Sequence, residues 1–290
     1  MRRPPVIRFA FLFGVLLTAP AIAQGAPAAA VPAKAPPRII PLYQSEGRVI
    51  ALMRIGAGEP VPMVFDTGSD GNTIDPVLVR RHRLRRSGTA IEVDGTSGRT
   101  RRLPMVRIPG VRLGGLAVGT IEAAVSPFDP DDAVGIISSE IFTDSLVAVD
   151  LARSQVRLTP RTTATPPAGP ATSYVGGIAT IALVLPGGSS IPAHVDTGYD
   201  AALSLPVAMM RTVPLYEPAK VVGSYTSISN SGEVWGGRIR GTIRIGPLTL
   251  HDPEVSFLGD IANIGLPLIR QVTLVLDPAG KRSWVLPARP

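Results

Sequence analysis

The chain contains no cysteine and only three histidines among its 290 residues. The absence of cysteine excludes disulfide bonds, thiolate ligands for zinc and a cysteine nucleophile. His82, His194 and His251 are too few and too dispersed for a histidine-rich metal site. These absences remove several common kinds of structural and catalytic site before any motif is considered.

Charged residues are also scarce, at 18% of the chain, and the one long apolar run lies near the start, from about residue 9 to 23. A basic Met1-Arg2-Arg3, this short run and the small residues Ala21-Ile22-Ala23 are typical of a secretory signal peptide over residues 1–23. The run is shorter than the roughly 20 residues that cross a membrane. We therefore expect export to the periplasm or the medium and a mature chain without a membrane span, the alternative being an uncleaved leader that serves as an anchor.

The formal charge of +7 is mild once the leader is considered, because removal of Arg2, Arg3 and Arg8 would lower it to +4. The remaining arginines are densest over residues 80–86 and 99–102. Such a run can bind nucleic acid or anionic lipid. No aromatic residues interleave it, which favours a solvated helix end, so we expect no nucleic-acid partner.

Glycine and proline are abundant, with 30 of each, and they lie between short apolar runs. No tripeptide period accompanies them, which argues against collagen. Frequent Gly/Pro punctuation with few long helical patterns predicts an all-β protein of many short strands.

Two segments rich in Pro and Ala divide the chain, at 24–37 and 159–173. We interpret the first as a flexible N-terminus and the second as a linker between domains at 38–158 and 174–290. The two halves match in order, with Asp66-Thr67-Gly68 recurring as Asp196-Thr197-Gly198, an offset of 130. The sequence therefore predicts one unit of about 130 residues that occurs twice by internal duplication.

Local patterns predict the elements of this unit. We expect strands at 48–55 and 61–65, a short helix from 75 or 76 to about 81, and a helical turn at 138–142. Further strands are expected at 91–94, 102–108, 111–113, 117–125, 146–150 and 155–158, and a long hairpin at 224–235.

An apolar strand that ends in Asp-Thr-Gly fixes a carboxylate at the end of a sheet. The Thr hydroxyl both donates and accepts hydrogen bonds, so it can join one loop to another, and Gly permits close approach of the backbone. One such tripeptide is weak evidence, because the Asp can simply cap its own turn. Two copies at the same place of a repeated unit favour a pair of functional loops.

These features resemble the bilobal pepsin/retropepsin-type aspartic peptidases, with each half similar to one retropepsin-like unit. The resemblance rests on Phe65-Asp66-Thr67-Gly68-Ser69, on Val195-Asp196-Thr197-Gly198-Tyr199 and on the later apolar-apolar-Gly segments. It implies two closed β-barrel lobes with pseudo-two-fold symmetry and a cleft between them. It also implies that Asp66 and Asp196 are the catalytic dyad of an aspartic-type endopeptidase.

The resemblance further implies supporting roles. The candidate residues for loop bracing and substrate binding are Thr67, Gly68, Ser69, Asp70, Thr197, Gly198, Tyr199, Asp200 and Tyr225. The tips at 95–98 and 225–232 are candidate flaps over a peptide substrate, although each can also be an ordinary surface hairpin. Two adjacent carboxylates share one proton and activate a water, so no metal or other cofactor is expected.

Two residues depart from the family pattern, and a third lies close to the dyad. Ser138 stands where Gly is usual, and Tyr199 replaces a small residue after the second Asp-Thr-Gly. His194 lies two residues before Asp196, hence on the same face of the strand, where a charged imidazole would lower the apparent pKa of the dyad. These departures keep open a non-catalytic peptide-binding protein of the same fold.

Two other possibilities bear on the mechanism. A serine hydrolase is disfavoured, since no Gly-x-Ser-x-Gly elbow occurs. Pairing of each half with its like in a second chain is disfavoured by the short linker and the different sequences of the halves. We expect a monomer whose two halves form the site together.

Overall fold

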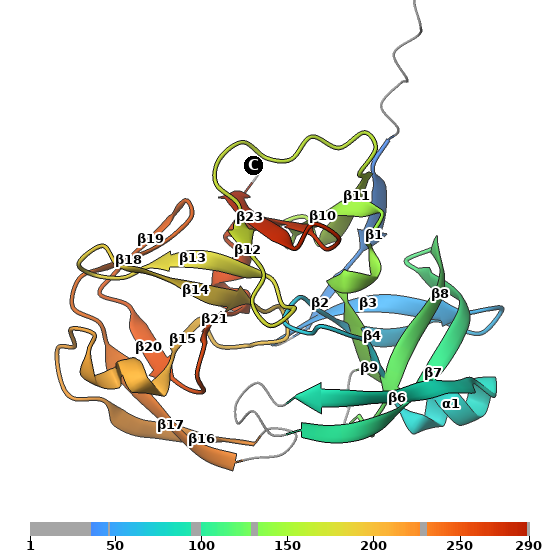
Figure 1. Ribbon diagram of the computed structural model, residues 1–290, viewed down its shortest axis with the longest axis horizontal. Helices are drawn as coiled ribbons and strands as arrows, with labels where there is room; N and C mark the ends of the chain where they lie inside the picture. The colour runs from blue at the N-terminus through green and yellow to red at the C-terminus, as the bar shows by residue number, and fades with distance from the viewer. Residues whose placement is uncertain (1–35, 46, 94–99, 129–132, 227–230, 289–290) are drawn as a thin grey trace, which may run out of the picture. The chain divides into compact units, whose positions relative to one another are not determined.

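The computed structural model of the chain describes residues 36–45, 47–93, 100–128, 133–226 and 231–288 (Figure 1). The predicted leader at 1–23, almost all of the segment at 24–37 and the first hairpin tip at 95–98 lie outside these residues. The described part is dominated by strands, which confirms the all-β class. Its helices are α1 (Pro76–His82) and α2 (Leu266–Ile269), with 3-10 turns η1 (Ser139–Ile141) and η2 (Val207–Arg211). None of them is long and apolar enough to cross a membrane.

The first half forms an eight-stranded sheet with the order β2-β3-β4-β9-β5-β8-β7-β6. The far end of β7 also pairs with β3, through Met53 and Leu113, so the hydrogen bonding closes a ring of strands. Its strands are β2 (Tyr43–Ser45), β3 (Arg48–Ile55), β4 (Val61–Asp66), β5 (Thr73–Ile74), β6 (Arg85–Val93), β7 (Thr100–Leu113), β8 (Leu116–Val125) and β9 (Gly135–Ser138).

The second half forms a nine-stranded sheet with the order β16-β17-β20-β15-β21-β14-β13-β18-β19. Taken from β13 towards β16, the strands follow the order β13-β14-β21-β15-β20-β17-β16. This matches the order β3-β4-β9-β5-β8-β7-β6 of the first half, so β14 corresponds to β4 and β21 to β9. Its strands are β13 (Thr180–Val184), β14 (Ser190–Val195), β15 (Leu203–Leu205), β16 (Lys220–Thr226), β17 (Ser231–Arg238), β18 (Thr242–Ile245), β19 (Leu248–His251), β20 (Glu254–Phe257) and β21 (Ala262–Ile264).

A third sheet takes strands from both halves, in the order β1-β11-β10-β22-β23-β12. Its central strands β10 and β22 are antiparallel partners and are buried along their whole length. The sequence indicated the two hairpins of this sheet but not their pairing with each other. Its strands are β1 (Arg38–Pro41), β10 (Ser145–Asp150), β11 (Gln155–Pro160), β12 (Thr172–Ser173), β22 (Val272–Asp277) and β23 (Arg282–Pro287).

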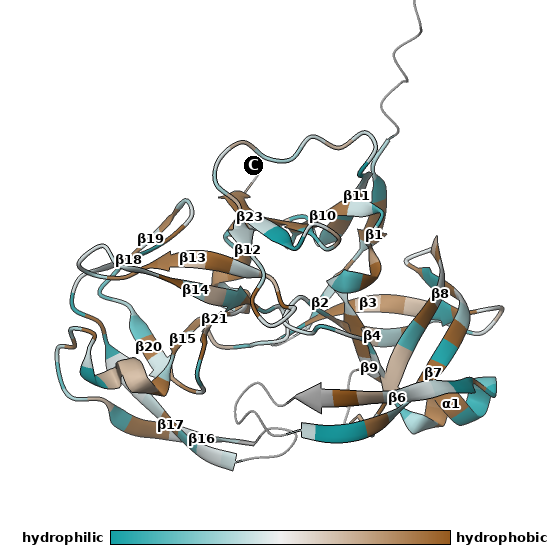
Figure 2. Cartoon of the chain, viewed as in Figure 1, coloured by the Kyte–Doolittle hydropathy of each residue, from teal (hydrophilic) through white to brown (hydrophobic). Residues whose placement is uncertain are grey.

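Burial follows the strand period that the sequence indicated. In β7 and β8 exposed and buried positions largely alternate, and hydrophobic and hydrophilic segments alternate along β8 in Figure 2. One large buried cluster includes side chains from both halves, among them Phe65 and Phe257, which are fully buried. Because Phe65 directly precedes Asp66, the core fixes the strand end that carries this aspartate.

Local signals account for the helix and the basic run. Asp75 caps α1 by accepting a hydrogen bond from the Val77 amide at 2.6 Å, and Pro76 opens the first turn. The helix ends at Arg83 in the left-handed region, with φ of 51°. The neighbouring arginines Arg80, Arg81, Arg85 and Arg86 are exposed, as expected for a solvated helix end that leads into β6.

The segment between the halves lacks regular secondary structure. Residues 161–171, between β11 and β12, contain turns and bends but neither strand nor helix. Most of the other expected boundaries are met within a few residues, but the strand expected at 91–94 is longer, because β6 begins at Arg85. The main difference is length, because the predicted strands at 102–108 and 111–113 form one strand, β7, with irregular pairing between Ile108 and Val111.

Candidate active site

The two Asp-Thr-Gly segments follow two equivalent strands. Asp66 ends β4 and Asp196 directly follows β14. β4 runs parallel to the short strand β9, and β14 runs parallel to the short strand β21. These neighbours fix the aspartates: Asp66 pairs with Ser138 of β9, and the Asp196 amide donates to Ile264 O of β21 at 2.9 Å. The same local structure therefore presents one carboxylate from each half.

Buried threonines join the two loops by reciprocal hydrogen bonds. The Thr67 hydroxyl donates to Val195 O at 2.6 Å, and the Thr197 hydroxyl donates to Phe65 O at 2.7 Å. Each hydroxyl also accepts from the backbone N–H of the opposite threonine at 3.1 Å. Thr67 and Thr197 are 2% and 0% exposed, so water does not compete for these bonds. The four bonds fix the two strand ends against each other.

The glycines after the threonines allow the carboxylates to meet. The Gly68 amide donates to Asp66 Oδ1 at 2.7 Å, and the Gly198 amide donates to Asp196 Oδ1 at 2.8 Å. A Cβ atom on Gly68 would overlap the Asp196 carboxyl carbon, and one on Gly198 would lie 2.8 Å from Asp66 Oδ2. Any side chain at either position would therefore separate the loops.

The two carboxyl groups interact directly. Burial raises the pKa of Asp66 well above its ordinary value, and the charge of Asp196 and a side-chain hydrogen bond with it raise this pKa further. The amides of Gly68 and Gly198 act in the opposite direction on the Asp66 pKa, but more weakly. A pair in this environment retains one proton to pHs where a free aspartate has lost it. One acid and one base are thus available at the same place.

The residues that follow each Gly have different surroundings. The Ser69 hydroxyl donates to Gly71 O at 2.7 Å within its own loop. The Tyr199 hydroxyl hydrogen-bonds Ser204 and Ser256, and burial raises the pKa of Tyr199. The phenol therefore packs against the sheet of the second half. This packing accommodates the large side chain that replaces a small residue after the second Asp-Thr-Gly.

Two further aspartates occupy equivalent positions. Asp70 and Asp200 each lie four residues after a central aspartate and are exposed. The Cβ of Asp70 faces Gly177 of the second half, and the Cβ of Asp200 faces Gly47 of the first. Each of these aspartates therefore lies where the two halves adjoin, beside the central pair.

Ser138 is accommodated by its own hydrogen bonds. Its hydroxyl donates to Ser69 O at 2.6 Å and accepts from the Glu140 amide at 3.1 Å, while its amide donates to Asn72 Oδ1 at 3.0 Å. The side chain thus packs the loop beneath Asp66. The departure from the usual glycine does not disrupt this loop.

The two long hairpins are β6–β7 and β16–β17, and both of their tips contain residues outside the described part of the chain. Tyr225 lies near the end of β16, opposite Gly232, and its ring is within 3 Å of the position a Cβ on Gly232 would take. Tyr225 thus covers its cross-strand neighbour.

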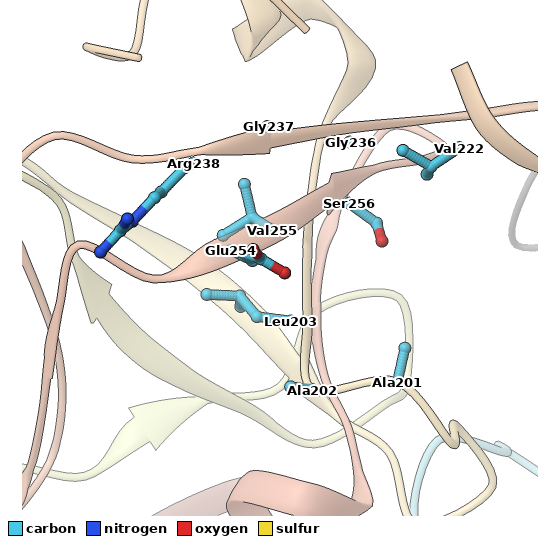
Figure 3. A pocket seen from close by; sticks show the side chains of 10 residues that line it. All are labelled: Ala201, Ala202, Leu203, Val222, Gly236, Gly237, Arg238, Glu254, Val255 and Ser256. Carbon is cyan, nitrogen blue, oxygen red and sulfur yellow. The ribbon is translucent and has the colours of Figure 1, made fainter. Parts of the chain in front are cut away.

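Two pockets adjoin the loops that follow Asp70 and Asp200. The first, of about 440 Å³, includes Asp70, Thr73 and Glu122 in its wall. The second, of about 370 Å³, includes Glu254 and Ser256, which are equivalent to Glu122 and Ala124 in the wall of the first. Figure 3 shows the second pocket, with Arg238 at one end of its wall and Val222 at the other.

Sequence reasoning missed one residue at the centre of the site. Asn263 Nδ2 donates to Asp196 Oδ2 at 2.9 Å. The sequence signal that could have identified Asn263 is its position directly before Ile264-Gly265, which belong to the later apolar-Gly segment of the second half. His194, which was considered, has its pKa lowered by burial, against the raising effects of a Val175 backbone hydrogen bond and the Asp196 charge. A charged imidazole is therefore not favoured near neutral pH.

The described residues contain no group of three or more His, Asp or Glu side chains arranged to hold a metal ion.

A comparison with known proteins agrees with this geometry. Residues 52–141 match a family model described as aspartyl protease. No curated protein matches the chain. The matched stretch includes Asp66-Thr67-Gly68 and ends before the second half begins. The match therefore supports an aspartyl protease domain over residues 52–141.

Proposed function

We propose that the chain is an aspartic-type endopeptidase whose catalytic dyad is Asp66 and Asp196, one from each half. The observation that carries the proposal is the reciprocal bonding of Thr67 and Thr197, which holds the two hydrogen-bonded carboxyls together. The family match supports the same chemistry for the first half. The equivalent geometry around Asp196 supports the same chemistry for the second half.

The reaction follows from a dyad that holds one proton. The charged carboxylate accepts a proton from a bound water, and the resulting hydroxide attacks the peptide carbonyl carbon. The protonated carboxyl donates to the carbonyl oxygen, which gives a tetrahedral diol. Collapse of the diol breaks the C–N bond and re-forms the C=O bond. The nitrogen takes the proton of the dyad as it leaves, and a diol hydroxyl returns its proton to the dyad, which restores the singly protonated pair. The two groups titrate as one unit.

The proposed molecule has two lobes made from one duplicated unit, related by a pseudo-two-fold axis through the dyad, and acts as a monomer. The repeated strand order and the equivalent contacts of Gly47 and Gly177 support it. The hairpins β6–β7 and β16–β17 would then be a pair of flaps, with Tyr225 near one tip. The pockets beside Asp70 and Ala201 would receive side chains of a peptide substrate.

The proposed place of action is outside the cytoplasm. The basic start, the short apolar run and the Ala-Ile-Ala pattern before Gln24 support it. Mass spectrometry of the N-terminus after expression in a secreting host tests this, since export with cleavage yields a chain that begins at Gln24. A chain that retains Met1 in the membrane fraction would indicate an anchor instead.

The activity is tested by digestion of a mixed peptide library from pH 3 to 7. We expect Asp66→Asn and Asp196→Asn each to lower kcat by about 10²-fold to 10⁴-fold, the range for loss of a general acid or base. Asp260→Asn is the matched control, because Asp260 is an exposed aspartate away from the loops. A loss of kcat of less than about ten-fold in either dyad variant contradicts the assignment. Peptide binding without turnover by the unmodified chain would instead indicate the non-catalytic alternative.

A further inference from the structure

The strands beneath the two aspartates carry different side chains at equivalent positions. In the first half Val64 of β4 pairs with Ile136 of β9. In the second half His194 of β14 pairs with Asn263 of β21, in the same parallel register. The first pair belongs to an apolar cluster completed by Ile50, Ala133 and Phe128. The second pair replaces two hydrocarbon side chains by two polar ones.

The replacement changes the hydrogen bonding of one aspartate only. Asp196 accepts on both oxygens, from the Gly198 amide at 2.8 Å and from Asn263 Nδ2 at 2.9 Å. Asp66 accepts from the Gly68 amide at 2.7 Å and also interacts with the Gly198 amide, but Ile136, at the position of Asn263, offers it no side-chain donor. An amide N–H bonds to a carboxylate more strongly than to a carboxylic acid, so Asn263 favours the charged form of Asp196.

His194 and Asn263 each leave one buried side-chain atom without a partner. The ring bonds the Val175 backbone, and its Nε2 is buried without a protein partner in the described part of the chain. Asn263 Oδ1 is likewise buried without a partner among the described residues. The hydrogen bond from Asn263 Nδ2 to Asp196 Oδ2 therefore directs the donor of this amide toward the dyad.

Resting on the proposed function, we propose that Asn263 is a positioning residue that holds Asp196 as the charged carboxylate and leaves the shared proton on Asp66. Asp66 is then the acid that protonates the substrate carbonyl, and Asp196 is the base that activates water. The different side chains on β9 and β21 thus give the two aspartates different hydrogen-bond donors and different roles in the reaction. The titratable groups that act on Asp196 are Asp66, His194 and Tyr199.

The test is the pH profile of kcat/KM for Asn263→Leu, which copies the apolar side chain of the first half. Without the donor, Asp196 is harder to ionise, so the midpoint of the acid limb moves to higher pH. We expect kcat to fall about ten-fold to a hundred-fold, the effect of one hydrogen bond to a charged group, with little change in KM. Asn263→Gln, which keeps an N–H donor, should return the acid limb toward its original position.

Variants of Ile136 provide the matched comparison. Ile136→Leu changes packing at the equivalent site without adding a donor, so both limbs of the profile should stay in place. Ile136→Asn offers Asp66 a donor and should move the base limb to lower pH. Thermal unfolding of each variant identifies any that fails to fold. A uniform loss of kcat in Asn263→Leu with both limbs unmoved would overturn the proposal, because that is the signature of a purely structural role.

A measurement that does not depend on turnover separates this proposal from the peptidase assignment. Carbon-13 NMR of labelled aspartate follows each carboxyl against pH, with signals assigned from Asp66→Asn and Asp196→Asn. We expect Asp196 to ionise before Asp66 in the unmodified chain and the gap to narrow in Asn263→Leu. Ionisation of Asp66 first would overturn the proposal even if peptides are cleaved. The expected order without cleavage would refute the peptidase alone.

Discussion

The two halves share a strand order but differ in how continuous their strands are. In the first half β7 and β8 run unbroken from the hairpin to the strands that close the sheet. In the second half the corresponding chain is divided, into β17 and β18 and into β19 and β20. The breaks coincide with Gly241 and Asp252, at φ of 113° and 49°. The shared strand order thus tolerates breaks remote from the aspartates.

Near the aspartates the two halves are closely alike, because the hydrogen-bond distances of Thr67 and Thr197 agree to within 0.1 Å. The Thr67 and Thr197 hydroxyls donate at 2.6 and 2.7 Å, and both accept at 3.1 Å. What varies is the layer beneath: Ser138 against Gly265, and Ile136 against Asn263. The molecule keeps the geometry of the pair symmetric while its supporting side chains differ.

The largest effect is expected when the supporting residues are exchanged. Gly265→Ser places a Cβ on the carbonyl oxygens of Tyr199 and Ala201, which belong to backbone and cannot move away cheaply. We expect a loss of about 3 kcal/mol in the free energy of unfolding. The reverse change, Ser138→Gly, loses the bond to Ser69 O and should cost about 1.5 kcal/mol. Urea unfolding measures both, and equal costs would show that the two loops are interchangeable.

The threonine brace should respond equally from either side. Thr67→Val and Thr197→Val keep the shape but leave a buried carbonyl and a buried amide of the other half without a partner. We expect each variant to lose about 2 kcal/mol of stability. The controls Thr67→Ser and Thr197→Ser keep the hydroxyl and should lose less. Since the two side chains form one network, the double Val variant should cost less than the sum, and strict additivity would argue against the network.

The stability of the fold should depend on pH through Asp66. Its pKa is raised in the folded chain, chiefly by burial, so the folded state keeps a proton that the unfolded chain loses near pH 4. Stability therefore falls as pH rises from that value through the folded pKa. Asp66→Asn should remove this fall, whereas Asp260→Asn should retain it. Urea unfolding from pH 3 to 8 distinguishes them, and an identical decline in both variants would place the titration elsewhere.

Much of the fold could be predicted because its signals are local. Apolar runs between turns located β3 and β4, and Asp75-Pro76 located the start of α1, since a cap and a proline act within one turn. The pairing of β10 with β22 could not be predicted in this way. It joins residues more than 120 positions apart, and two buried strands carry no pattern that names their partner.

The candidate site shows the same division between local and distant information. The repeated tripeptide identified Asp66 and Asp196, since its residues act on their own loop and on its copy. The role of Asn263 depends on the parallel register of β14 and β21, which places it beside an aspartate 67 residues away. An Asn in a strand has no chemical signature of its own. Only the comparison with Ile136 shows what it adds.

The smallest effect is expected at Tyr199, where the second half carries a phenol and the first half carries Ser69. Tyr199→Phe keeps the ring and removes the hydroxyl that bonds Ser204 and Ser256. Because Ser204 is 2% exposed, it loses a partner that water cannot readily replace, at a cost of about 1 kcal/mol. Peptide hydrolysis should be almost unchanged, since the hydroxyl is directed toward its own sheet. Tyr43→Phe, at an exposed tyrosine outside the loops, is the matched control and should leave stability unchanged. A large loss of kcat in Tyr199→Phe at unchanged stability would contradict this expectation, because it would show that the Tyr199 hydroxyl takes part in catalysis and does not only pack against its sheet.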